Sequence, residues 1–146
     1  MKYTITIIAL LITTFGFSQQ SKRERIEALK VTYITEKLNL TEKEAQQFWP
    51  IYNAYDDITD KIKYNELKKI HREVRENSET LSEARASELL NQVMAAQNKL
   101  HEEKIKLNTK LKKIISPKKI ILLKIAEEDF KKRLFEEWKK RGKNKK

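Results

Sequence analysis

The chain has 146 residues and a formal net charge of +11, with 36% of its residues charged and 39% hydrophobic. It contains two glycines, two prolines and no cysteine, so it has little turn chemistry for β-hairpins, and no disulfide can stabilise it. This composition is typical of long amphipathic helices and predicts one all-α domain without strands.

Residues 1–18 have the pattern of a secretory signal peptide. Lys2 supplies a positive start, the apolar run YTITIIALLITTFGF follows, and Gly16 and Ser18 stand at the −3 and −1 positions of a cleavage site. A retained membrane anchor is the alternative, but a spanning helix needs roughly 20 apolar residues and this run is shorter. We therefore expect cleavage and export to the periplasm.

Export changes which partners the positive charge implies. The predicted mature chain is a helical domain over residues 19–142 with a basic tail at 143–146. Nucleic acid is the usual partner of so basic a protein, but it is not expected outside the cytoplasm. An anionic membrane surface, cell-wall polymers or acidic stretches of unfolded protein are better candidates. Alternatively, the lysines only keep a helical surface soluble.

Four amphipathic helices are predicted, and the first spans about residues 22–38. The second begins after Thr41, because Thr41 and Glu44 can form a capping box, and it is expected to run for about 33 residues. Its apolar stripe has steps of three and four, except for one step of five between Ile62 and Leu67. The stripes of the two helices are Ile26, Leu29, Tyr33 and Ile34, and then Ala45, Phe48, Tyr52, Tyr55, Ile58, Ile62, Leu67, Ile70 and Val74.

Pro50 lies deep inside the second helix. A proline there removes one backbone donor and clashes with the preceding turn, so we expect the helix to bend or restart at this point. Such a bend can shape a concave surface, or it can simply let the neighbouring aromatic side chains reach the core. Of Phe48, Trp49, Tyr52 and Tyr55, we expect most to lie in the core and Trp49 to be partly exposed.

The third helix is expected to begin at Thr80 or Ser82, and Thr80 with Glu83 would form another capping box. The fourth begins with Ser116 as its cap and Pro117 at the first helical position, where a missing N–H costs nothing. The stripes of these two helices are Leu89, Leu90, Val93, Ala96, Leu100, Leu107, Leu111 and Ile114, and then Ile120, Leu123, Ala126, Phe130, Leu134 and Trp138.

Two segments carry a family resemblance. With LNLTEKEAQQFWPIYNAYDD near its start and ISPKKIILLKIAEEDFKKRL near its end, the chain resembles the LTxxQ group of periplasmic proteins, which includes Spy, CpxP, CnrX and ZraP. It is most similar to Bacteroidetes proteins described as sensors of ECF-type sigma factors. The resemblance implies a long antiparallel helical hairpin with shorter flanking helices, which dimerises into a curved cradle.

The motif positions of this family are degenerate here. The matching residues are Leu40, Thr41, Ser116 and Pro117. Glu44 replaces the glutamine of the first motif, and Lys119 occupies the glutamine position of the second motif. Glu44 can still close a capping box, so the departures leave the helix-capping role intact.

No catalytic constellation is present, so we expect neither an enzyme nor a cofactor. The candidate metal ligands are His71, His101 and Met94. Met94 and His101 lie two helical turns apart, about 10 Å, which is too far for one ion. In the implied hairpin the two histidines would be roughly 24 Å apart, so one protomer could not bring both to one ion.

The sequence therefore predicts a non-enzymatic, chaperone-like sensor of envelope stress. It would act as a homodimer and bind unfolded protein or a membrane-associated regulator of a sigma and anti-sigma factor pathway. The expected partner surface is Phe48, Trp49, Pro50 and Tyr52. A periplasmic heavy-metal sensor or scavenger is the alternative function, and a structural coiled-coil tether is a weaker one.

Overall fold

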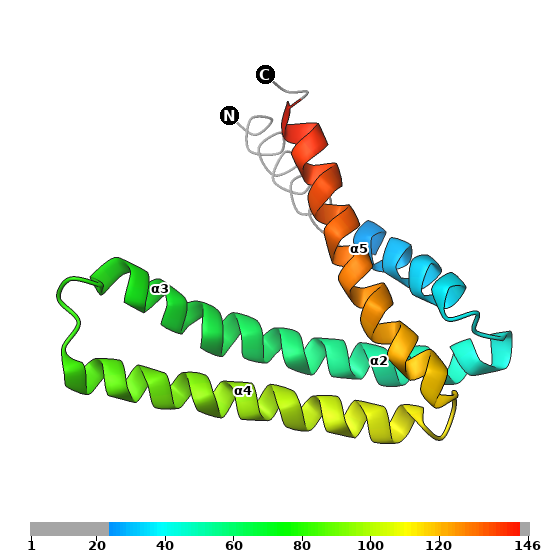
Figure 1. The fold of residues 1–146 in the computed structure, drawn as a ribbon, viewed down its shortest axis with the longest axis horizontal. Helices are drawn as coiled ribbons and strands as arrows, with labels where there is room; N and C mark the ends of the chain where they lie inside the picture. Colours follow the sequence, from blue (N-terminus) through cyan, green and yellow to red (C-terminus); the bar gives the residue numbers. More distant parts are fainter. Residues whose placement is uncertain (1–23, 144–146) are drawn as a thin grey trace, which may run out of the picture. The chain divides into compact units, whose positions relative to one another are not determined.

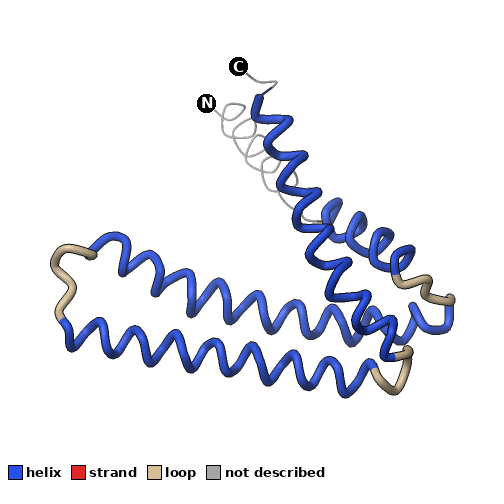
Figure 2. Tube along the Cα trace, in the orientation of Figure 1, coloured by secondary structure: helices blue, strands red, loops and turns tan. Residues whose placement is uncertain are grey.

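The computed structural model describes residues 24–143, with side chains described through residue 140. The elements are a helix over residues 24–37, α2 (Glu42–Ile62), the π-helix η1 (Lys63–Leu67), α3 (Lys68–Asn77), α4 (Glu83–Leu111) and α5 (Pro117–Lys143) (Figure 1). No strand occurs in this part of the chain (Figure 2), and the predicted all-α class is confirmed. The predicted signal peptide lies outside the described residues.

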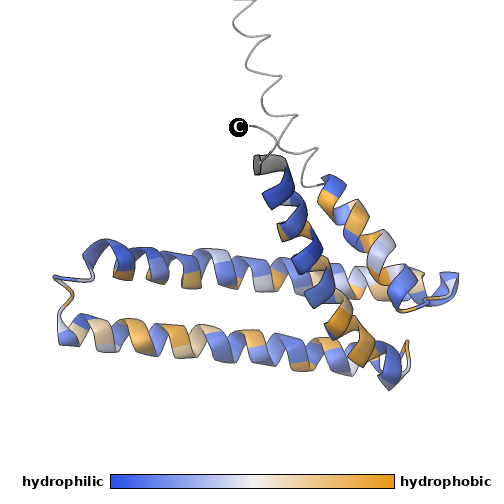
Figure 3. Cartoon of the chain, turned by 45° about the horizontal axis from the view of Figure 1, so that its top comes forward, coloured by the Kyte–Doolittle hydropathy of each residue, from blue (hydrophilic) through white to orange (hydrophobic). Residues whose placement is uncertain are grey.

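The chain divides into two compact units. Thr41–Ile120 form one unit, and the described residues on either side of it, 24–40 and 121–143, together form the other. In the first unit α4 runs antiparallel beside α2, η1 and α3, so the expected long hairpin is confirmed (Figure 1). Hydrophobic residues recur along both arms of this hairpin, with hydrophilic residues between them (Figure 3).

The core of the hairpin is formed by apolar side chains from both arms. The buried residues are Phe48, Tyr52, Ile62 and Ile70 from the first arm, and Leu89, Ala96, Leu107 and Leu111 from the second. Ion pairs join the arms at the edges of this core, between Glu73 and Arg85 at 2.7 Å and between Glu66 and Lys99 at 2.9 Å. These two ion pairs join residues that lie opposite one another in a hairpin folded near Ser78.

The segment before α2 ends one helix and starts the next. Asn39 has a positive φ of 46°, the left-handed conformation that asparagine tolerates better than most residues. The Leu40 N–H donates to the Thr35 carbonyl and the Asn39 N–H to the Glu36 carbonyl, which is the Schellman pattern of a helix end. Thr41 then caps α2, so the sequence LNLT is a helix stop followed directly by a helix start.

α2 runs through Pro50 without a break. Of the two outcomes expected at Pro50, the restart is therefore wrong, and the bend stays a prediction. Pro50 and Gln46 are both exposed, so the ring lies on the solvent side and water can reach the Gln46 carbonyl that loses its backbone partner. The exposed position explains how the helix accommodates this residue.

The irregular turn lies further along, at η1. The apolar stripe reaches the core at Phe48, Tyr52 and Ile62 and then at Ile70. Regular heptad spacing would continue from Ile62 to residues 66 and 69, which are Glu66 and Lys69. A π-turn adds one residue to the helix and rotates the following segment, so that Leu67 and Ile70 face inward instead. The step of five in the sequence and the π-helix are the same feature.

Five residues that were placed on the apolar faces are exposed in the structure. They are Leu29, Ile58, Val74, Leu90 and Trp138. Thr59 is buried where Ile58 was expected, because the heptad positions that follow Tyr52 and Tyr55 include residue 59 and not 58. The Thr59 hydroxyl donates to the Asp56 carbonyl at 3.1 Å, which satisfies its polar group in the core.

Ser82 caps α4, since its hydroxyl accepts from the Arg85 N–H at 3.3 Å. The predicted capping box of Thr80 and Glu83 is wrong. The Thr80 hydroxyl instead donates to the Asn77 carbonyl at 3.4 Å and helps to close the turn after α3. Ser at the N-cap and Thr within the turn both follow ordinary side-chain preferences.

The second unit packs the helix of residues 24–37 against α5. Its buried residues are Ile34, Leu38, Leu123, Ala126 and Phe130. The Tyr33 and Phe130 rings lie 5.8 Å apart, and the Arg133 guanidinium lies 4.9 Å from the Tyr33 ring centroid. These are ordinary aromatic and cation–π contacts.

Candidate functional site

The two helix starts that carry the family resemblance, at Thr41 and at Ser116, both lie within the Thr41–Ile120 unit. Thr41 and Glu44 form the predicted capping box, with the Glu44 N–H donating to Thr41 Oγ1 at 3.2 Å and the Thr41 N–H to Glu44 Oε2 at 2.8 Å. At the start of α5, the Lys119 N–H donates to Ser116 Oγ at 3.4 Å, as expected for a cap with Pro117 at the first helical position. Both predicted helix starts are confirmed.

Glu44 and Lys119 connect these two helix starts. Lys119 Nζ donates to Glu44 Oε2 at 2.7 Å, so this one oxygen closes the capping box and also holds the first turn of α5. The Lys119 hydrogen bond first, and the Thr41 N–H second, keep the pKa of Glu44 below its ordinary value of 4.5. The two residues that depart from the motif glutamines are thus partners, and their role is structural.

The aromatic group beside this junction is mostly core, as expected. Phe48 is 0% exposed and Tyr52 is 1% exposed, and their rings stack at 5.4 Å. Trp49 packs edge-on against Phe48 at 5.0 Å and is partly exposed, while Pro50 is exposed. Phe48 and Tyr52 cannot be part of a partner surface in this conformation, so that part of the prediction is wrong.

A second apolar surface lies on α4, and sequence reasoning missed it. Leu90, Met94 and Ile105 are 60%, 54% and 52% exposed. At 3.6 residues per turn they share one face, which also carries His101 and lies about 120° from the buried face of the helix. We call Leu90, Met94 and Ile105 the α4 stripe.

The sequence contained a signal for the α4 stripe. Leu89, Val93, Ala96, Leu100 and Leu107 fit steps of three and four, or multiples of them, and define the buried face. Leu90 and Ile105 do not fit that series. The predicted apolar stripe of this helix includes Leu90 and omits Ile105. Leu90 and Ile105, which are apolar but out of phase with the buried face, were therefore the signal in the sequence for the α4 stripe.

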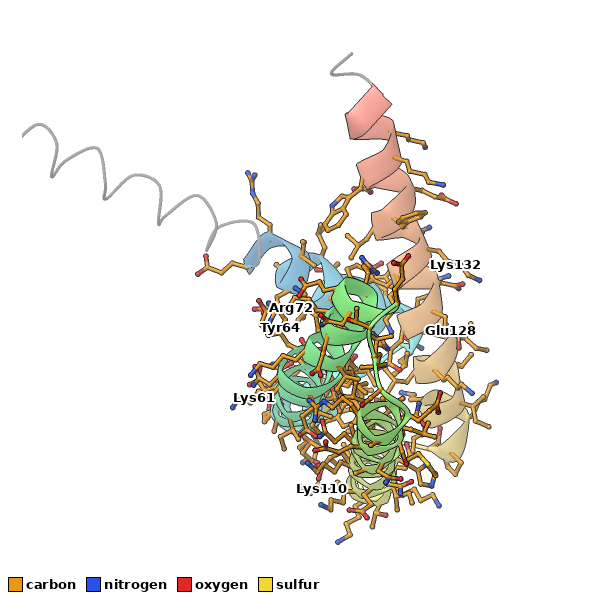
Figure 4. All side chains as sticks on the ribbon, turned by 90° about the vertical axis from the view of Figure 1, so that its left-hand side faces the viewer. Lys61, Tyr64, Arg72, Lys110, Glu128 and Lys132 are labelled. Carbon is orange, nitrogen blue, oxygen red and sulfur yellow. The ribbon has the colours of Figure 1, made fainter. Side chains whose placement is uncertain are left out.

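The π-turn displays an aromatic residue. Tyr64 is exposed and lies with Lys61 and Arg72 on the outer side of the α2–η1–α3 arm (Figure 4). The Lys68 ammonium lies 4.4 Å from the Tyr64 ring centroid, which is cation–π distance. Tyr64 therefore already has a partner within its own helix.

An ion-pair network at the hairpin tip was also missed. The Arg85 guanidinium binds Glu73 through two nitrogens, at 2.7 and 2.9 Å, and Glu88 at 2.6 Å. The bond to Arg85 lowers the pKa of Glu73 below its ordinary value. Because Glu73 lies in α3 and Arg85 in α4, this contact closes the tip of the hairpin.

The candidate metal ligands His71, His101 and Met94 are all exposed. His71 lies in α3, whereas Met94 and His101 lie in α4. Within residues 24–140 there is no group of three or more His, Cys, Asp or Glu side chains that could hold a metal ion. The ion pairs Glu73–Arg85 and Glu66–Lys99 place His71 beside a different part of α4 from the one that carries His101.

None of the helices in the described part of the chain is both long enough and apolar enough to span a membrane. Comparison with known proteins identifies no matching protein family, no similar curated protein and no similar solved structure. The functional argument therefore rests on the surfaces of the protein itself.

Proposed function

We propose that this protein is an exported, non-enzymatic component of an envelope-stress response, related to the LTxxQ group. It binds apolar segments of unfolded protein, or of a membrane-associated regulator in a sigma and anti-sigma factor pathway, through the α4 stripe. The observation that carries this proposal is the exposure of Leu90, Met94 and Ile105 on one face of a long helix.

Three large apolar side chains on one helical face are suited to binding extended or helical apolar segments. The flexible, polarisable side chain of Met94 adapts to partners of different shape. The stripe lies on a helix anchored by Leu89, Ala96 and Leu107, so its residues are held in place before a partner binds. A rigid helix with an adaptable apolar face favours weak, reversible binding of many sequences.

The positive charge supports the same function. Without the predicted signal peptide, which contains Lys2, the net charge is +10 (11 − 1), and it attracts acidic stretches of unfolded proteins over a distance of about 10 Å at 0.1 M salt. We expect client binding to weaken as salt is raised, because the exposed charges are screened. It should not disappear, because the apolar contacts of the α4 stripe persist.

The test is suppression of the aggregation of a thermally unfolding client, without nucleotide. The variant Leu90→Gln, Met94→Gln, Ile105→Gln removes the α4 stripe but keeps good helix formers at each position. We expect its activity to fall at least fivefold. The matched control is Ile121→Gln, Ile125→Gln, which replaces exposed apolar residues of α5 and should retain full activity.

Both variants should remain as helical and as stable as the parent, because exposed substitutions rarely change stability by more than about 0.5 kcal/mol. Circular dichroism and thermal unfolding provide this check. Equal activity of the parent and the α4 variant would overturn the proposal. Loss of activity in the control alone would instead assign client binding to α5.

A further inference from the structure

α5 has apolar side chains on two sides. Leu123, Ala126 and Phe130 are buried within their unit. Phe135 and Trp138, which lie one helical turn apart, are 58% and 64% exposed. A helix that is apolar on a second side has a further surface available for contact.

Positive charge is concentrated at the same end of the chain. Residues 131–146 include nine basic and two acidic residues, which gives +7 of the chain's net charge of +11. At 3.6 residues per turn, the two acidic residues, Glu136 and Glu137, lie about 130° around the helix from the face of Phe135 and Trp138. Lys131 lies on the aromatic face itself.

Lysine and aromatic side chains are closely associated in this segment. The Lys139 ammonium lies 4.6 Å from the ring centroid of Phe135. Lys131 and Lys132 are exposed, and Lys132 projects from the outer side of α5 (Figure 4). Long lysine side chains can keep the ammonium group among phosphates while neighbouring rings lie at the level of the headgroups.

We propose that residues 131–140 of α5 form a membrane-surface site for anionic phospholipid. Phe135 and Trp138 insert at the level of the headgroups, and the surrounding lysines bind lipid phosphates. The combination of an exposed Trp, an exposed Phe and a dense positive charge on one amphipathic helix is the pattern of an interfacial helix. Charge complementarity commits the site to an anionic bilayer.

This site is separate from the α4 stripe and does not depend on the proposed client binding. It places the protein on the membrane surface, because the aromatic pair reaches only the headgroup level. A protein held there would meet membrane-associated partners at high local concentration.

The experiment uses the chain that begins at Gln19, the expected mature form, with Trp49→Phe so that Trp138 is the only tryptophan. Tryptophan emission is recorded with vesicles of phosphatidylglycerol and phosphatidylcholine, and with phosphatidylcholine alone. We expect a blue shift with the anionic vesicles only. Soluble glycerol phosphate and a short DNA duplex are added separately and should cause no blue shift.

Vesicle co-sedimentation then tests the residues. Phe135→Ser, Trp138→Ser should reduce the fraction bound at least tenfold, whereas Ile121→Ser, at a site that is 67% exposed outside the basic segment, should bind within twofold of the parent. Glu136→Lys, Glu137→Lys should bind more tightly, which tests the site even if the double serine variant is less helical.

Several results would overturn the proposal. They are an unshifted Trp138 emission with anionic vesicles, vesicle binding that survives loss of both aromatic residues, and binding of DNA in place of vesicles. Client suppression is measured on the same variants. If vesicle binding is lost while client suppression persists, the membrane site is confirmed independently of the proposed function.

Discussion

At the start of the hairpin, Glu44 Oε2 accepts two hydrogen bonds, one from the Thr41 N–H and one from Lys119 Nζ. A carboxylate suits this position because it lies in the first turn of α2, where the helix dipole favours negative charge. Glutamine could close the capping box, but it could not form the ion pair with Lys119. The charged pair therefore forms one direct link between α2 and the first turn of α5.

Glu44→Gln should lower stability at pH 7, and the deficit should disappear in acid. The folded-state pKa of Glu44 lies below 4.5, so its contribution is present above that value and is lost as pH falls through the folded pKa. Thermal unfolding from pH 7 to pH 2 measures the difference. Glu42→Gln is the control, because Glu42 lies in the same turn but does not bind Lys119. A deficit of constant size at every pH would contradict this account.

The sequence could not reveal the partner of Glu44. Spacing identified both caps, because Thr41 and Glu44 are three residues apart and the Ser116–Pro117 pair is local. Lys119 lies 75 residues from Glu44, and no local pattern relates them. Leu90 and Trp138 were misplaced for a different reason. Apolar character alone does not distinguish a core residue from one on an exposed face. The distinction depends on the angular position of the residue around the helix, relative to the buried face.

At the scale of elements, the step of five between Ile62 and Leu67 has a structural cause in η1. Deletion of Asn65 should convert η1 into regular α-helix and leave the hairpin folded, because the stripe would then continue from Ile62 in steps of four and three. Chemical denaturation should give a stability close to that of the parent.

Deletion of Asn53 is the matched control for this prediction. It removes one residue where α2 is regular, so it shifts Phe48 and Tyr52 out of phase with Thr59 and Ile62. Displacing buried side chains of this size costs roughly 1.5–3 kcal/mol each. If both deletions are equally destabilising, the π-turn does not set the register of the first arm.

Pro50→Ala should stabilise the protein. Alanine restores the N–H that can donate to the Gln46 carbonyl, and the gain is up to about 3 kcal/mol. Because Pro50 is exposed, the substitution leaves no cavity. Urea denaturation measures the change. A variant that is more stable but poorer at suppressing aggregation would show that the shape of α2 at Pro50 serves binding, whereas equal activity would assign Pro50 to packing alone.

The sequence predicted where the helices begin better than it predicted how α2 behaves at Pro50. The helices α2, α4 and α5 begin within a few residues of their predicted starts, because Thr41, Ser82 and Ser116 all carry local capping signals. The long hairpin followed from the family resemblance and is confirmed. Continuation of α2 through Pro50 could not be predicted, because it depends on whether the proline lies on the solvent side of the helix, and the aromatic residues around Pro50 obscured that side.

At the scale of the whole molecule, we predict a homodimer. Large apolar residues outside the α4 stripe and outside residues 131–140 are also exposed, among them Leu29, Ile121 and Ile125, and thin helical units cannot cover them all within one chain. Light scattering at tens of micromolar should give twice the mass of the monomer. The variant without the α4 stripe should remain dimeric if that surface is reserved for clients. A monomer mass for the parent would contradict the prediction.

The central claim is that clients bind the α4 stripe, and site-specific photo-crosslinking tests it most directly. A photoreactive residue at Met94 is compared with one at Gln92, which is also exposed but lies about 160° around the helix. We predict that an unfolding client crosslinks at position 94, that native client does not, and that position 92 gives little product. Equal crosslinking at both positions, or none at position 94 while aggregation is still suppressed, would contradict the account.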